Sequence, residues 1–297
     1  MKIVQSFWSK PMTHGSGRLI NSGGWFNKRL FLYGSVLSAL LLERHYPGQT
    51  VFVTDRFGED LFINKLNMPF GKVIVELDEL NDLNETLWAA GKLYAYARMR
   101  EHFVHFDQDF FLPQPLSDDL TNASLVAYTS EFSQPKQQNI YIPNITNFLN
   151  TTLVLNSRVR NFCNNEPRMA YNAGIMGGDR TEIFEELWDL SFEIIKNNTH
   201  IFRQINCHFF NVVLEQFLFT CLARDNKIPV TCLENESSIM IESKYTDMKF
   251  FPFVSSVHVM ANGKCASSSC VSIPEILKIN FPDHYYLINK LLRYNLV

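Results

Sequence analysis

The 297-residue chain lacks the features that would place it among membrane, secreted or nucleic-acid-binding proteins. No apolar run approaches the ~20 residues that a membrane-spanning helix needs. The first residues, Met1 to Trp8, show no signal-peptide hydrophobic region and instead predict a strand. The formal net charge of -3 argues against a nucleic-acid binder, because such a protein normally presents a basic surface. We therefore expect a cytoplasmic protein without a transmembrane segment and without a nucleic-acid partner.

Two further absences narrow the class of protein. The six cysteines are scattered and form no CxxC pair. In a reducing compartment we therefore expect buried or incidental thiols, and neither a disulfide framework nor a zinc site. The loop from Ser9 to Gly24 is rich in glycine but does not match GxGxxG, which argues against dinucleotide binding.

The chain does contain an alternation of strand-like apolar segments and segments of helical period. The expected strands are 2–7, 50–54, 72–75 and 102–106, and the expected helices include 28–46 and 86–99. This alternation predicts an α/β protein with a Rossmann-like, mostly parallel sheet flanked by helices. We expect one domain over residues 1–265 and a helical extension over 266–297 that packs on it. The last helix, expected over 281–297, carries Lys290 and Arg293, which leaves peripheral contact with the inner face of a membrane open.

Two carboxylates, Asp107 and Asp109, follow the expected strand 102–106 and stand directly before Phe110 and Phe111. Carboxylates in so apolar a setting are costly to desolvate unless a cation meets them. If the chain stays extended, both side chains point to the same face. Hard divalent cations prefer oxygen ligands, and a nucleotide diphosphate supplies several more. Because ligands of such sheets bind at the carboxyl ends of strands, this DxD favours a metal–diphosphate site over a polar turn with solvated acids.

Two later segments place polar groups in apolar surroundings. The segment 171–175, Tyr-Asn-Ala-Gly-Ile, is followed by Gly177 and Gly178, which predicts a short strand whose backbone closely approaches a ligand or another strand. Glu215 and Gln216 lie in the middle of a very apolar expected helix, where a charge needs either a partner or solvent.

Near the C-terminus, His258 lies in an expected β segment over 250–259, and Lys264 follows six residues later. A lone histidine is more often a structural residue than a ligand. The lysine, which comes just after a glycine, improves the case for a joint metal and phosphate role.

Taken in order, these motifs resemble the GT-A fold of nucleotide-sugar glycosyltransferases, and most closely its glycogenin-like, galactosyltransferase-like group. In that group a helix with a Lys-Leu pair precedes the DxD strand, and Lys92 with Leu93 stands in that place. A Phe-Asn-Ser/Ala-Gly-Val segment comes later, and residues 171–175 are similar to it. An Asp-Gln pair that opens a helix comes next, with Glu215 and Gln216 as a loose counterpart.

The group's last motif is a His, a Gly three residues on and a Lys six residues on. His258 and Lys264 match this spacing, and Ala261 stands where the group has Gly. The resemblance covers roughly residues 1 to 265 and consists of ordered short motifs.

The resemblance implies transfer of a sugar from a UDP-sugar, or another nucleoside-diphosphate sugar, to an unidentified acceptor, which we expect to be a bacterial glycan or glycolipid. The implied cofactor is Mn2+ or Mg2+, with Asp107, Asp109 and His258 as metal ligands. The implied donor-binding residues are Phe7, Trp8, Asp55, Lys92, Asp107, Asn172, Ala173, Gly174 and Lys264. The implied catalytic residues are Glu215 and Gln216.

Two other functions stay open from the sequence. A non-catalytic GT-A-like nucleotide-binding protein would keep the fold without turnover, and the replacement of the motif's Gly by Ala261 is compatible with that. A Mg2+-dependent phosphoryl-transfer enzyme would use the same DxD. Haloacid-dehalogenase-type phosphatases carry their DxD after the first strand, however, whereas here it follows a long run of α/β structure.

Overall fold

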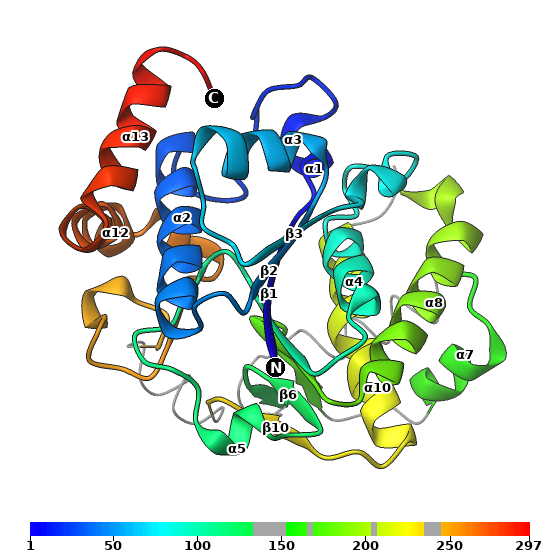
Figure 1. Cartoon of the computed structure of the whole chain (residues 1–297). Coiled ribbons are helices and arrows are strands. Elements are labelled where there is room, and N and C mark those ends of the chain that lie inside the picture. The colour runs from blue at the N-terminus through cyan, green and yellow to red at the C-terminus, as the bar shows by residue number, and fades with distance from the viewer. Residues whose placement is uncertain (133–152, 165–168, 203–206, 235–244) are drawn as a thin grey trace. The chain divides into compact units, whose positions relative to one another are not determined.

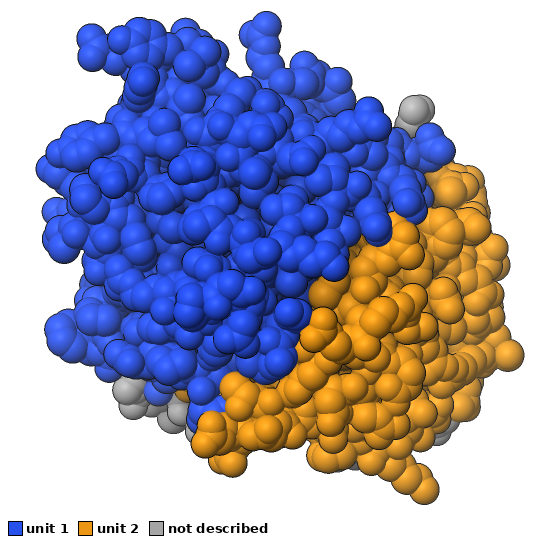
Figure 2. Space-filling model, viewed as in Figure 1, with its two compact units in different colours: residues 1–85, 105–117, 237–297 blue, residues 86–104, 118–236 orange. Residues whose placement is uncertain are grey.

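The computed structural model describes residues 1–132, 153–164, 169–202, 207–234 and 245–297. The chain divides into two compact units, which Figure 2 colours separately. Unit 1 comprises residues 1–85, 105–117 and 237–297, and unit 2 comprises 86–104 and 118–236. Each unit is therefore discontinuous in sequence.

Unit 1 contains a parallel β-sheet, several short helical segments and three long helices. Its strands are β1 (Lys2–Phe7), β2 (Thr50–Thr54), β3 (Lys72–Val75), β5 (Phe110–Phe111) and β11 (Val257–His258). Its helices are α1 (Lys10–Thr13), α2 (Lys28–His45), α3 (Arg56–Gly58), α12 (Ser267–Asn280) and α13 (Pro282–Arg293), and its shorter helical turns are η1 (Glu59–Lys65), η2 (Leu77–Leu80), η6 (Met248–Phe250) and η7 (Ala261–Cys265).

Strands β1, β2 and β3 pair in parallel, with Ile3 opposite Thr50 and Val51 opposite Lys72. All five residues of β2 are buried, as expected for a central strand that helices or loops cover on both faces. The bounds of all three strands agree with the sequence prediction.

Helix α2 is buried over every residue from Leu30 to Leu42, which is more than one helix face. The reason is that α12 and α13 pack against α2, and Figure 1 shows them beside it. Tyr33 of α2 illustrates the contact, because its ring stacks on Tyr285 at 5.3 Å and its hydroxyl donates to Asn289 at 2.9 Å. Both C-terminal helices thus pack against α2 within unit 1. The predicted division into a domain over 1–265 and an extension over 266–297 stays a prediction.

Unit 2 contains short strands and helices of its own. Its strands are β6 (Leu125–Ala127), β7 (Ser130–Phe132), β8 (Met169–Tyr171), β9 (Ile175–Gly178) and β10 (Val230–Cys232). Its helices are α4 (Ala89–Arg98), α5 (Asp118–Thr121), α7 (Ser157–Asn164), α8 (Thr181–Asn197), η3 (Thr199–Ile201), α9 (Cys207–Val212), the π-helical η4 (Val213–Phe217) and α10 (Leu218–Asp225). Strand β4 (Phe103–Phe106) contains the point at which the chain passes from unit 2 into unit 1.

The glycines of β9 allow close strand contacts within unit 2. A side chain at Gly177 would clash with the backbone of Phe103 and Val104. One at Gly178, whose φ is 140°, would clash with the carbonyl of Ser124. The sequence predicted that the backbone of this segment closely approaches either a ligand or another strand. In the structure it closely approaches neighbouring strands.

The predicted fold class is confirmed as an α/β fold with a seven-stranded, mostly parallel sheet. Within that sheet β9 runs antiparallel to β6. Within the described residues no helix combines the length and the apolar character needed to cross a bilayer.

Two local predictions are wrong. The expected β segment over 250–259 is reduced to β11, because Phe250 closes a 3₁₀ turn and Pro252 has no N–H to donate. The inserted loop expected from residue 130 begins instead with strand β7, and its residues 133–150 lie outside the described part. The helix predicted over 281–297 is present as α13, and α12 precedes it.

Candidate metal centre and its surroundings

The DxD forms a turn between two buried strands. The Phe110 N–H donates to the Asp107 carbonyl at 3.0 Å, so the chain does not stay extended as the sequence argument assumed. Strands β4 and β5 on either side are fully buried. The two carboxylates therefore converge through the turn, and they do so on a rigid apolar support.

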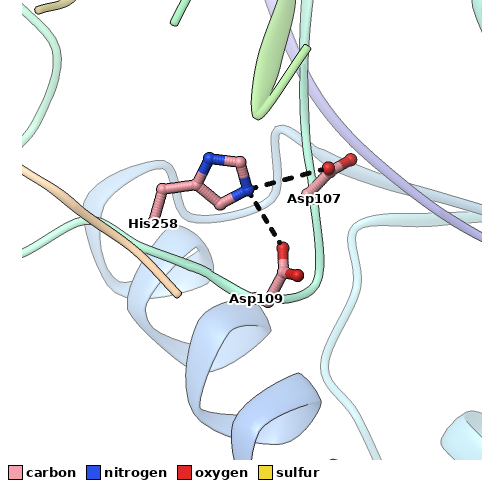
Figure 3. Close-up of side chains that lie close together, drawn as sticks. All are labelled: Asp107, Asp109 and His258. Atoms are coloured by element: carbon pink, nitrogen blue, oxygen red, sulfur yellow. Dashed lines mark ion pairs between the residues drawn. The ribbon is translucent and has the colours of Figure 1, made fainter. Parts of the chain in front are cut away.

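His258 reaches the DxD because β11 pairs antiparallel with β5, with His258 opposite Phe110. The Val259 N–H also donates to the Asp109 carbonyl at 3.0 Å. Figure 3 shows the resulting cluster, in which His258 Nε2 lies 3.9 Å from Asp107 Oδ2 and 3.4 Å from Asp109 Oδ1. The structure thus brings together the three metal ligands predicted from the sequence.

The donor set of this cluster fits a divalent cation. One ligand atom from each of the three residues can be chosen so that all lie within 4.8 Å of one another. In octahedral Mg2+ sites, neighbouring ligand atoms are about 3 Å apart, because the metal–oxygen distance is about 2.1 Å. Asp109 Oδ1 is buried and makes no hydrogen bond within the described part of the chain. Carboxylates suit Mg2+ and Mn2+, and the imidazole favours the softer Mn2+.

Lys264 supplies a positive charge to the same cluster. Its Nζ lies 2.7 Å from Asp109 Oδ2, and the two side chains are only 19% and 13% exposed. Burial raises the pKa of the Asp109 carboxyl, but Lys264 and His258 outweigh burial and hold that pKa well below its usual range. Asp109 is therefore ionised at neutral pH, as a metal ligand must be.

The turn that carries Lys264 contains a strained residue. Ala261, which stands where the resembled motif has Gly, has a φ of 43°. This left-handed conformation favours glycine, because Cβ of other residues crowds the backbone there. Ala261 therefore has the backbone conformation that glycine would adopt in this turn, and this conformation is less favourable for alanine than for glycine.

A pocket of about 320 Å³ lies near the carboxyl ends of β1 and β2, also in unit 1. Its lining residues are Ser9, Lys10, Thr13, Gly15, Gly17, Asp55, Phe57, Asp78 and Asn81. Asp55 accepts from the backbone N–H groups of Ser9 at 2.7 Å and Gly58 at 2.8 Å. Burial raises the pKa of the Asp55 carboxyl, and these hydrogen bonds oppose the shift. The pocket thus has a fixed polar wall, with Phe57 as its aromatic component.

Phe7 and Trp8, predicted to contact the nucleotide, precede this pocket at the end of β1. Phe7 is a core residue whose ring lies 5.1 Å from that of Phe62. Trp8 is 5% exposed, and its indole N–H has no hydrogen-bond partner among the described residues. Asp55 borders the pocket, whereas Phe7 and Trp8 are not among its lining residues.

The remaining predicted residues belong to unit 2. Glu215 is fully buried in η4, where its Oε1 lies 2.8 Å from Lys92 Nζ and accepts from the Tyr96 hydroxyl at 2.7 Å. The charge in this apolar helix thus has the partner that the sequence argument required. Sequence reasoning missed Tyr96, although its position four residues after Lys92 places both on one face of α4.

Gln216 and residues 172–175 are also buried in unit 2, and Tyr171 is half-buried. Gln216 Oε1 has no hydrogen-bond partner within the described residues. Asn172 accepts from the Gly174 N–H at 2.9 Å and donates to Glu131 at 2.8 Å, so its amide orders the turn between β8 and β9. The motif spacing did not indicate Glu131 as a partner of Asn172, just as it did not indicate Tyr96 as a partner of Glu215.

No curated protein matches the sequence of this chain, whereas many solved structures are similar to it, including the following two. Mouse xyloside xylosyltransferase 1, in its apo form, has a TM-score of 0.43 and 13% sequence identity, with 88% of this chain and 98% of that chain covered. An active-site mutant of LgtC has a TM-score of 0.39 and 11% identity, with 72% of this chain and 70% of that chain covered. Over residues 1–291 the chain matches DUF6734, a family of unknown function, and it belongs to that family.

Proposed function

We propose that this protein is a metal-dependent glycosyltransferase that uses a nucleoside-diphosphate sugar, with a UDP-sugar as the expected donor. The observation that carries the proposal is the cluster of Asp107, Asp109 and His258, which offers two carboxylates and an imidazole within reach of one ion. The order of the sequence motifs around this cluster supports the same reaction class.

In this proposal Asp107, Asp109 and His258 hold Mn2+ or Mg2+. When bound, the ion acts as a Lewis acid that neutralises the charge developing on the diphosphate leaving group. Lys264 adds a cation for the same phosphates. Burial of the cluster strengthens each of these interactions, because the surroundings have a low dielectric constant.

The nucleoside would occupy the pocket beside Ser9 and Asp55. Strand β4, which leads to the DxD, is tied to β1 by a hydrogen-bond contact of 2.9 Å between Ser6 Oγ and His105 Nε2. Ser9 and Asp107 follow these residues by three and two positions, so the pocket and the metal cluster belong to the same edge of unit 1. The pocket volume of about 320 Å³ is at the lower end of the range for small-molecule sites.

The sugar-side roles predicted in unit 2 are part of this proposal. Asn172, Ala173 and Gly174 would line the sugar pocket, Lys92 would reach the donor, and Glu215 with Gln216 would be catalytic. Gln216 Oε1 has no hydrogen-bond partner among the described residues, which supports a ligand contact there, because buried polar groups normally have partners. The acceptor would be a bacterial glycan or glycolipid.

One observation favours a non-catalytic nucleotide-binding protein as the second candidate. Glu215 is fully buried and is engaged by both Lys92 and Tyr96, so it offers no exposed carboxylate to a substrate. A protein that binds a nucleotide sugar without turnover would tolerate this arrangement.

A panel of nucleotide sugars, assayed for slow hydrolysis with Mn2+ or with EDTA, tests both candidates. The glycosyltransferase predicts Mn2+-dependent release of UDP from one sugar, and loss of that release in Asp109→Asn. The binding protein predicts that UDP with Mn2+ raises the thermal unfolding temperature while every sugar stays intact. Both candidates are wrong if UDP with Mn2+ does not raise the unfolding temperature and no UDP is released from any sugar.

A further inference from the structure

Lys264 makes three contacts that together hold its ammonium group at the metal cluster. Besides the 2.7 Å contact with Asp109 Oδ2, its Nζ donates to the Gly23 carbonyl at 3.1 Å. The same Nζ lies 5.7 Å from the ring centroid of Trp25. The ammonium therefore has a fixed position in which one of its strongest partners is a carboxylate predicted to bind the metal.

A divalent ion and this ammonium compete for Asp109. An ion bound to the carboxylate would place two further positive charges beside Nζ, and like charges repel strongly in partly buried surroundings. Asp109 Oδ1 can take the ion while Oδ2 still faces the ammonium, but this repulsion weakens the contact between Lys264 and Asp109. Gly23 and Trp25 are neutral and do not replace a carboxylate partner, so the charge of Lys264 is left under-compensated unless an anion arrives with the metal.

We propose that Lys264 makes the site select a metal–diphosphate complex over the free metal ion. A free ion weakens the contact between the ammonium and Asp109 and brings no anion in compensation. A metal-bound diphosphate brings anionic oxygens that take the place of the Asp109 carboxylate as partner of Lys264. This inference rests on the proposed function, because the diphosphate is that of the proposed donor. It adds that Lys264 makes metal binding and nucleotide binding mutually dependent.

The first test measures free Mn2+ binding by isothermal titration calorimetry without nucleotide. Lys264→Met keeps the apolar stem against Trp25, and Lys264→Gln is a second neutral variant in case the first does not fold. We expect either to bind Mn2+ roughly tenfold more tightly than the wild type, because no neighbouring ammonium then repels the ion. Lys264→Arg, which keeps the cation, is expected to stay close to the wild type.

The matched control is Lys249→Gln. Lys249 lies 3.1 Å from Asp247 and so also belongs to a Lys–Asp pair of unit 1, but it is 56% exposed and does not contact the cluster. Its loss changes the net charge by the same amount. If Lys249→Gln tightens Mn2+ binding as much as the Lys264 variants do, the effect is that of net charge and the inference is wrong. It is also wrong if the neutral Lys264 variants bind Mn2+ no more tightly than the wild type.

The second test repeats the Mn2+ titrations with saturating UDP and with UMP. In the wild type we expect UDP to tighten Mn2+ binding by a larger factor than in Lys264→Met, and UMP to have a smaller effect than UDP. Equal UDP factors in both proteins would overturn the inference. If UDP does not bind the wild type at all, the proposed function fails, whereas the titrations without nucleotide still decide whether Lys264 competes with the metal.

Discussion

Replacing Ala261 by Gly should stabilise the protein, contrary to the usual effect of glycine. Ala261 has a φ of 43° and an exposed side chain, so the substitution removes backbone strain and little buried surface. An alanine in this conformation costs about 1–2 kcal/mol relative to an unstrained one. The extra freedom of glycine in the unfolded chain takes back about 0.4–1 kcal/mol. We therefore expect a net gain of about 1 kcal/mol in the free energy of unfolding.

Urea unfolding followed by circular dichroism measures this gain, and thermal unfolding should show a rise of about 2 °C in Tm for a chain of this size. Ala266→Gly is the matched control, since Ala266 lies five residues later at an ordinary φ of -64°. There the same substitution should destabilise the protein, because only the entropic cost applies. If both variants lose stability by the same amount, Ala261 is not strained and the reasoning is refuted.

Three further predictions concern the cluster, the buried ion pair and the C-terminal helices. Asp109→Asn should abolish Mn2+-dependent UDP binding in calorimetry, whereas Asp60→Asn, which changes an exposed acid, should keep it. Unchanged binding in Asp109→Asn would mean that Asp109 is not a metal ligand. Lys92→Met should cost about 3–5 kcal/mol in urea unfolding because it strands the fully buried Glu215 charge, and adding Glu215→Gln should recover most of the loss. If the double variant is no more stable than Lys92→Met, the ion-pair argument fails. Leu277→Ala should cost about 2–5 kcal/mol, since Leu277 is fully buried in α12; a loss below about 1 kcal/mol would mean that α12 does not belong to the core of unit 1.

The parallel strands of unit 1 were predictable because the determining information is local. Residues 2–7, 50–54 and 72–75 are short apolar runs between turn signals, and a buried strand needs little more. That Asp107, Asp109 and His258 lie together was predictable from the sequence, because the spacing of His258 and Lys264 matched a motif. The geometry of this cluster was not, because the turn at the DxD depends on the pairing of β5 with β11, which joins distant segments.

The bounds of α12 and the pairing of Lys92 with Glu215 depend on long-range packing. Helix α12 begins with serines and contains Pro274, so its local sequence is a poor helix former, and burial of residues such as Leu277 against α2 compensates. Likewise the spacing of Lys92 and Glu215 does not show that they pair, since more than a hundred residues separate them. Local propensity identifies neither the bounds of α12 nor the pairing of Lys92 with Glu215.

The pairing of β5 with β11 makes the order of synthesis matter for the cluster. Asp107 and Asp109 leave the ribosome long before His258 and Lys264, and most of unit 2 is made in between. A nascent chain that ends before residue 257 therefore carries both carboxylates beside Phe110 and Phe111 with neither the imidazole nor the ammonium group to offset their charge. In the proposed metal site, Mn2+ binding would therefore report that the C-terminal segment has docked, and a truncated chain should not acquire it.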